Sequence, residues 1–148
     1  MPIPDFEDAG LLPVGIHDCS LDEVRERFGK FQGTDRRCRL FERLEALIHQ
    51  MKATGFFAAI IVDGSFVTDK GSPNDIDLIL VLRPSHEMTL PLRPFEYNVV
   101  SRRQVRRQFG IDALITREGR PEFSEYLGFF AGVRGKPNAR KGLVRLTL

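Results

Sequence analysis

The residues best suited to chemistry lie in one stretch, IVDGSFVTDKGSPNDIDLILVL, residues 61–82. Asp75 and Asp77 stand two positions apart at the start of an apolar run. If that run is a strand, both carboxylates project from the same face, with Cα atoms roughly 6.5–7 Å apart. At that separation two carboxylates repel by roughly 2–3 kcal/mol at an effective dielectric near 20, and a divalent cation between them reverses the sign. Hard oxygen ligands favour Mg²⁺ or Mn²⁺, so the pair predicts a metal site whose ion also binds phosphate.

Gly64 and Ser65 supply the second half of this predicted site, because they directly follow the apolar run FFAAIIVD, residues 56–63. A glycine allows the backbone to approach a phosphate closely. If a short helix begins near Ser65, its free N–H groups point at an anion, and the Ser65 hydroxyl adds a further donor. The whole pattern is a strand, Gly-Ser, nine residues, Asp-x-Asp and a second strand.

This combination resembles the polymerase-beta-type nucleotidyltransferase superfamily, whose signature is a Gly-Ser followed by an Asp-x-Asp on the next strand. The segments GIHDCSLDEVRERFG, DGSFVTDKGSPNDIDLILV and KGLVRL look like a poorly characterised branch of its small, single-domain bacterial members. The resemblance implies the nucleotidyltransferase fold and a site with two Mg²⁺ or Mn²⁺ ions held by Asp75 and Asp77. Gly64 and Ser65 would bind the terminal phosphates of ATP or another nucleoside triphosphate. Pyrophosphate would leave, and a hydroxyl on a protein, an RNA or a small molecule would accept the nucleotide.

The resemblance also implies a third carboxylate on a later strand, which binds one metal and activates the acceptor. Asp112 is the predicted residue, because it lies in the strand-like segment IDALI, residues 111–115, and is expected to point inward. The alternative is that Asp112 only ends the turn at Gly110. Glu96 and Glu118 are further alternatives for the third carboxylate.

Several basic residues are weaker candidates for phosphate binding. Lys70 lies between the two halves of the motif and could reach a phosphate as a point charge, although a surface lysine is the alternative. The segment 133–142 is expected to be a loop that could close over the triphosphate; its basic residues are Arg134, Lys136, Arg140 and Lys141, of which Arg134 and Lys141 are the predicted phosphate ligands. Asp63, directly before Gly64, could touch a metal or orient the Gly-Ser turn, but it is expected to cap that turn.

The remaining sequence predicts the elements that position this site. A capping box at 20–23 begins a short helix, and apolar residues with a 3.6-residue period predict a longer helix from about 35 to 53. Strands are predicted at 56–63, 76–82, 111–115 and 143–148, and helices from 101 to 110 and from 122 onward. Residues 1–19 are expected to be an extended arm, and Pro84, Pro91 and Pro94 predict a loop. This order predicts one α+β (α/β-like) domain over residues 1–148, with a small mixed sheet, flanking helices and two N-terminal helices.

Composition limits the class of protein. The chain has 148 residues, 42% of them hydrophobic, and no apolar run reaches the roughly 18 residues of a membrane span. The N-terminus lacks the features of a signal peptide, and Cys19 and Cys38 predict neither a disulfide framework nor a zinc site. The expected location is therefore the cytoplasm, with no membrane contact.

Charge is unevenly placed along the chain. Residues 1–100 carry a net charge of −5, and residues 101–148 carry +7, with Arg102, Arg103, Arg106 and Arg107 close together on one predicted helix. This basic third could face a nucleoside triphosphate, an RNA or a partner protein, or it could be a solvated face. The alternative to an enzyme is a non-catalytic nucleotidyltransferase-fold module, such as the antitoxin-like partner of a toxin–antitoxin pair. Glycosyl transfer fits the Asp-x-Asp but not the Gly-Ser.

Overall fold

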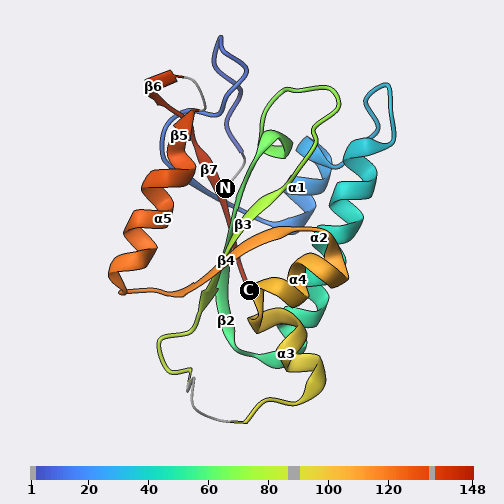
Figure 1. The fold of residues 1–148 in the computed structure, drawn as a ribbon. Coiled ribbons are helices and arrows are strands. Elements are labelled where there is room, and N and C mark those ends of the chain that lie inside the picture. Colours follow the sequence, from blue (N-terminus) through green and yellow to red (C-terminus); the bar gives the residue numbers. More distant parts are fainter. Residues whose placement is uncertain (1–2, 87–90, 134–135) are drawn as a thin grey trace.

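A five-stranded mixed sheet forms the centre of the protein (Figure 1). The computed structural model describes residues 3–86, 91–133 and 136–148. The sheet has the order β1-β7-β2-β3-β4, and its strands are β1 (Ile16–Cys19), β2 (Phe57–Asp63), β3 (Asp77–Leu82), β4 (Asp112–Arg117) and β7 (Leu143–Thr147). β2 pairs antiparallel with both β3 and β7, whereas β1 is parallel to β7 and β4 is parallel to β3. A separate two-stranded pair joins β5 (Gly132–Val133) and β6 (Lys136–Arg140).

Helices cover the sheet unequally. α1 (Leu21–Phe28), α2 (Arg36–Thr54), α3 (Pro94–Val100) and α4 (Arg102–Phe109) lie on one face, whereas α5 (Pro121–Ala131) lies on the other (Figure 1). α1 begins at the predicted capping box, in which Ser20 and Glu23 exchange backbone-to-side-chain hydrogen bonds of 3.1 and 3.2 Å. α2 and α4 both end at glycines in the left-handed conformation, Gly55 and Gly110.

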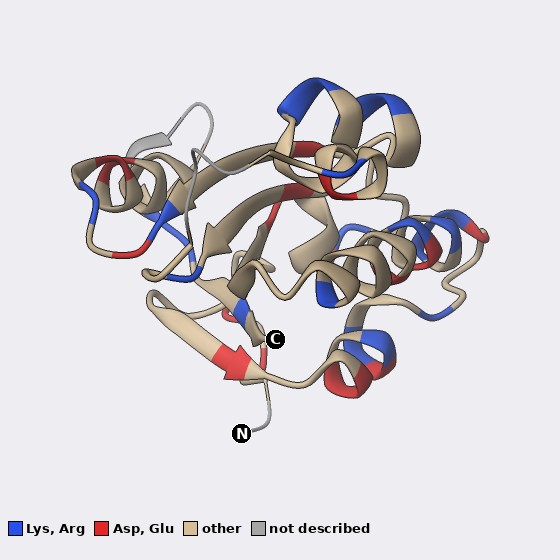
Figure 2. Ribbon diagram, turned by 90° about the horizontal axis from the view of Figure 1, so that it is seen from below, with Lys and Arg blue, Asp and Glu red and all other residues tan. Residues whose placement is uncertain are grey.

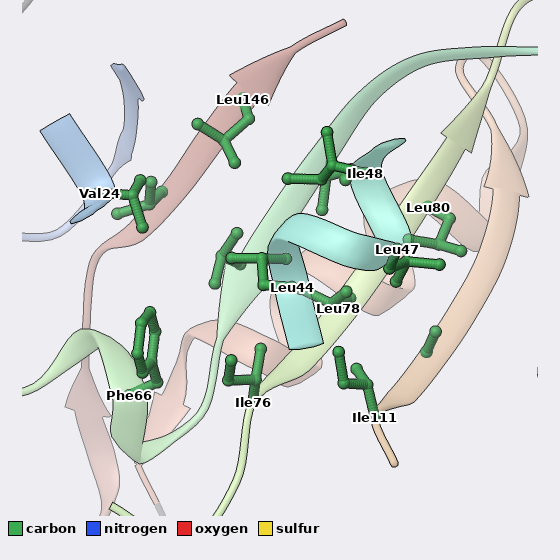
Figure 3. Close-up of a cluster of buried hydrophobic side chains, with 14 of the residues drawn as sticks. Val24, Leu44, Leu47, Ile48, Phe66, Ile76, Leu78, Leu80, Ile111 and Leu146 are labelled. Atoms are coloured by element: carbon green, nitrogen blue, oxygen red, sulfur yellow. The ribbon is translucent and has the colours of Figure 1, made fainter. Parts of the chain in front are cut away.

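The main core lies between the sheet and α2. Leu44, Leu47 and Ile48 face the sheet from α2, and they pack near Ile76 and Leu78, which are 2% and 0% exposed (Figure 3). Ile76 and Leu78 therefore anchor the start of β3 by their burial. Full burial of side chains of this size stabilises the fold by about 1.5–3 kcal/mol each, so β3 is held firmly next to the candidate site.

The predicted fold class is confirmed as an α+β domain with a mixed sheet and flanking helices. Three local predictions are wrong. The N-terminal segment is not an extended arm, because it turns at residues 8–11 and residues 16–19 join the sheet as the edge strand β1. The Pro-rich segment contains α3, in which Pro94 occupies the first helical turn, where its missing N–H is harmless. The segment 133–142 is not a plain loop, because it contains β6. None of the helices in the described part of the chain is long and apolar enough to cross a membrane.

Candidate active site

Three aspartates lie in register across neighbouring strands. Asp63 at the end of β2 is paired with Asp77 at the start of β3, and Asp77 is paired with Asp112 at the start of β4. Paired residues project from the same face of a sheet. This face is the one covered by α5. Ile61, Ile79 and Leu114 lie two residues from Asp63, Asp77 and Asp112 respectively and so share their face, and all three pack in the cluster that α5 contributes to. Figure 2 shows acidic segments on neighbouring strands, with basic segments on the helices beside them.

The sequence had suggested that Asp75 lies on the same strand as Asp77, but Asp75 lies before that strand. β3 begins at Asp77, and Asp75 lies in the preceding loop with its side chain exposed. Its Oδ1 accepts hydrogen bonds from the Ser65 backbone N–H at 3.3 Å and from Ser65 Oγ at 3.2 Å. Ser65 Oγ also accepts a hydrogen bond from the Asn74 N–H at 3.1 Å. The Gly-Ser turn and the Asp-x-Asp segment are therefore in direct contact, which the spacing alone did not establish.

Gly64 makes this contact sterically feasible. Its φ is +93°, a conformation that L side chains rarely adopt. A Cβ at this position would meet the Asp75 carbonyl, Asp75 Oδ1 and the Asp77 N–H, each at 3.1 Å. A side chain at position 64 would therefore push the two halves of the site apart. A 3₁₀ helix, η1 (Ser65–Val67), follows the glycine as a single short turn.

Arg37 of α2 holds the loop after the Gly-Ser turn. The side chain is 1% exposed, and its guanidinium donates hydrogen bonds to the carbonyls of Phe66, Thr68 and Lys70 at 2.7, 2.7 and 2.5 Å. A fourth bond reaches the Phe28 carbonyl at 3.2 Å. Burial lowers the pKa of Arg37. A buried cation that satisfies so many carbonyls fixes the shape of the loop.

Arg36 of α2 holds the later part of the same loop, since its guanidinium donates hydrogen bonds to the carbonyls of Pro73 and Asn74 at 2.9 and 2.8 Å. Neither arginine was predicted from the sequence as part of the site. A signal was present for Arg37, because position 37 precedes Leu40, Phe41 and Leu44 by three, four and seven residues and so falls on the apolar face of α2. A charged residue on that face requires a buried partner.

Asp63 is the most deeply buried carboxylate of the row, and Lys141 is its partner. The exposed fractions of the two side chains are 6% and 16%, and Lys141 Nζ lies 2.9 Å from Asp63 Oδ1. Burial raises the pKa of Asp63, and the Lys141 ammonium acts in the opposite direction. Asp63 therefore does more than cap a turn, and Lys141 reaches the site from the segment just before β7.

Asp77 lies half-buried in the middle of the row. Burial, followed by the charges of Asp75, Asp63 and Asp112, raises the pKa of Asp77 to about 6, while Lys141 acts in the opposite direction. A carboxyl with this perturbation in a cleft marks a candidate functional site.

Asp112 does not point inward. Its side chain is 52% exposed and forms an ion pair with Arg106 of α4 at 2.5 Å. The alternatives for a third carboxylate do not join the row, because Glu96 is buried in the first turn of α3 with Arg93 and Glu118 is exposed beyond the end of β4.

A cleft of about 1040 Å³ contains these groups. It is lined by Gly64, Ser65, the aspartates 63, 75, 77 and 112, and the cations Lys70, Arg102, Arg140 and Lys141. The α5 side of the cleft contributes Gly128, Phe129 and Phe130. The structure thus brings together the predicted residues except Arg134, which lies outside the described residues.

A metal ion would have to be held chiefly by the pair Asp75 and Asp77. Among the residues that the structure describes, no three His, Cys, Asp or Glu side chains are grouped so as to hold a metal. The pair nevertheless fits Mg²⁺ or Mn²⁺ in donor chemistry, since both residues offer carboxylate oxygens and such ions complete their shell with water and phosphate oxygens.

Comparisons with known proteins give a family and no function. No curated protein matches the chain, and no solved structure matches it. Residues 4–147 match the model of a family of unknown function, DUF6932, and the chain therefore belongs to that family.

Proposed function

We propose that this protein is a metal-dependent nucleotidyltransferase with the nucleotidyltransferase fold. It would move a nucleoside monophosphate from a nucleoside triphosphate, with ATP favoured, to a hydroxyl on a protein, an RNA or a small molecule. The observation that supports this most is the contact between the Gly64–Ser65 turn and Asp75, next to the half-buried Asp77. Hydrogen-bond donors that suit a phosphate and carboxylates that suit a metal ion therefore lie together at one end of the sheet.

Each residue has a role in this proposal. The N–H and hydroxyl of Ser65 bind the terminal phosphates once they have released the Asp75 carboxylate, to which both donate in the free protein, and Gly64 lets the backbone approach the phosphates. Asp75 and Asp77 would hold Mg²⁺ or Mn²⁺, which would supply positive charge to offset the charge of the triphosphate. Lys70, Lys141 and Arg140 line the same cleft and add positive charge for the phosphates.

The reaction needs a group that accepts the proton of the acceptor hydroxyl. Asp112 takes this role, because its carboxylate is exposed next to Asp77 in the strand register. The acceptor oxygen forms a bond to the α-phosphorus, the bond from that phosphorus to the β-phosphate bridging oxygen breaks, and pyrophosphate leaves. The proton passes to Asp112, which must first separate from Arg106.

One observation favours a second candidate, a non-catalytic module that keeps the same site, such as an antitoxin-like partner protein. Asp112 is already neutralised by Arg106. Thermal unfolding with Mg²⁺ and ATP bears on this alternative, because a ligand at 100 times its Kd stabilises the fold by about 2.7 kcal/mol. Stabilisation without transfer would favour a nucleotide-binding module, and a flat response would favour a module that uses only its surface.

Transfer is tested by incubating the protein with Mg²⁺, each nucleoside triphosphate labelled at the α-phosphate, and cell lysate as the source of acceptor. We expect labelled acceptor with at least one nucleotide, and loss of the label with Asp75→Ala/Asp77→Ala. An exposed-acid variant, Asp8→Ala, serves as the matched control and should label normally. The proposal fails if no acceptor is labelled, or if the double variant labels as well as the wild type.

A further inference from the structure

An exposed aromatic ring stands at the wall of the cleft. Phe129, near the end of α5, is 78% exposed, whereas its neighbour Phe130 is 7% exposed. Phe130 packs against Ile61 and Ile79 on the sheet and so anchors this end of the helix. The centroids of the two rings are 6.1 Å apart and the rings are tilted by 47°, and most of the Phe129 ring stays accessible to solvent.

The surroundings of Phe129 leave room for a ligand. Gly128 precedes it, and a Cβ at Gly128 would meet nothing within 4 Å. Gly132 follows on the same wall, with Arg140 Nη1 3.6 Å from the position of its Cβ. An apolar ring therefore lies beside open space, with a cation close to the end of the same helix.

The two walls of the cleft differ in chemistry. The strand ends carry the carboxylates and the Gly64–Ser65 turn, while α5 contributes an aromatic face. The volume of about 1040 Å³ is at the upper end for small-ligand sites. A molecule with a charged phosphate end and a flat aromatic end matches both walls, and a nucleotide has these two parts.

We infer that Phe129 is the stacking platform for the nucleobase of the nucleotide. This inference rests on the proposed function and adds the residue that recognises the base. Stacking on an aromatic side chain tolerates every base, since each has a π-face. The platform therefore makes the site select nucleotides over inorganic polyphosphates, without strong choice among the bases.

The experiment compares Mg²⁺-nucleoside triphosphates with Mg²⁺-tripolyphosphate, which has the phosphates but no base. Binding is measured by calorimetry for the wild type, Phe129→Ala and the control Phe31→Ala, whose ring is 66% exposed outside the cleft lining. We expect Phe129→Ala to weaken all four nucleotides by about 5- to 100-fold and to leave tripolyphosphate binding and melting temperature unchanged. Phe31→Ala should bind every ligand like the wild type.

Phe129→Trp gives an independent readout, because the chain contains no tryptophan. The single indole should retain nucleotide affinity, and its fluorescence should be quenched by ATP and not by tripolyphosphate.

Different failures have different meanings. If Phe129→Ala binds nucleotides as tightly as the wild type while tripolyphosphate still binds, the stacking inference is overturned and the proposed function stands. If neither nucleotide nor tripolyphosphate binds the wild type, the proposed function fails together with the inference. A change in oligomeric state of Phe129→Ala in size-exclusion chromatography would also overturn the inference, since the ring would then belong to a protein interface.

Discussion

The carboxylates of Asp63 and Asp77 are neighbours in the sheet, yet their surroundings differ. Asp63 lies against the Lys141 ammonium, and both side chains are largely buried. Asp77 lies between three other aspartates, and burial together with their charges raises the pKa of Asp77 to about 6. At neutral pH without metal, the charge of Asp77 therefore opposes folding, as is common for residues kept for function.

Asp77→Asn should make the metal-free protein more stable at pH 7.5, by about 1–2 kcal/mol after allowance for solvent screening. The pKa of Asp77 is higher in the folded state than the 3.8 of a free aspartate. The folded state therefore holds the proton more tightly, and wild-type stability from this group falls as the pH rises from about 4 to 6. Urea unfolding in EDTA should show a difference at pH 7.5 that disappears near pH 4.

The control for this measurement is Asp8→Asn, an exposed acid in the N-terminal segment. An Asp77→Asn variant that is no more stable than Asp8→Asn at pH 7.5 would contradict the electrostatic account of this residue.

Lys141→Met should destabilise the protein by about 3–5 kcal/mol, because it leaves the Asp63 carboxylate buried without its cation. Adding Asp63→Asn to this variant should recover a large part of the loss. Lys30→Met removes an ion pair with Glu26 on the surface, where both side chains are well exposed, and should cost less than about 1 kcal/mol. If Lys141→Met and Lys30→Met lower the free energy of unfolding equally in urea, the buried Asp63–Lys141 pair contributes no more to stability than the surface pair.

At the scale of elements, α2 positions the loop that carries Ser65 and Lys70. Arg37→Met should destabilise the protein by roughly 3–5 kcal/mol, since four carbonyls lose a charged donor in a buried place. Hydrogen exchange should also accelerate at Val67 and Thr68, whose N–H groups bond within the loop.

Arg39→Met is the matched control on the same helix, because Arg39 forms an exposed ion pair with Asp35. The role of Arg37 is refuted if loop exchange in Arg37→Met matches that in Arg39→Met.

Elements with a local signal could be predicted from the sequence. α1 and α4 have capping residues, α2 has a 3.6-residue period, and β2 and β3 are apolar runs of strand length. β1 has four residues and depends on pairing with β7, more than 120 residues away. Such a short edge strand has no local signal.

The residues of the candidate site also fall into those that the sequence predicts and those that depend on contacts between distant segments. Gly64, Ser65 and Asp77 follow from spacing, because they lie where two adjacent strands meet. The placement of Asp75 before the strand, the Asp63–Lys141 pair and the Arg37 contacts depend on segments far apart in the chain. Distant pairs of this kind are set by tertiary packing, which periodicity does not encode.

In the whole molecule, the site lies between the ends of β2, β3 and β4 and the helix α5. Within the described residues, α1 to α4 pack on one face of the sheet and α5 packs on the other, so the cleft opens between the strand ends and α5. The basic helix α4 lies beside the acidic row and pairs with it through Arg106 and Asp112, and Figure 2 shows the acidic and basic segments near one another. A cleft lined by both carboxylates and cations suits a phosphorylated ligand bound through a metal.

The most direct test of the central claim is a crystal structure with Mn²⁺ and a nucleoside triphosphate analogue that cannot be cleaved between the α- and β-phosphates. We expect an anomalous Mn²⁺ peak against Asp75 and Asp77, and triphosphate oxygens within hydrogen-bond distance of the Ser65 N–H and hydroxyl. Nucleotide bound elsewhere on the protein, or Mn²⁺ bound away from these two aspartates, would contradict this claim.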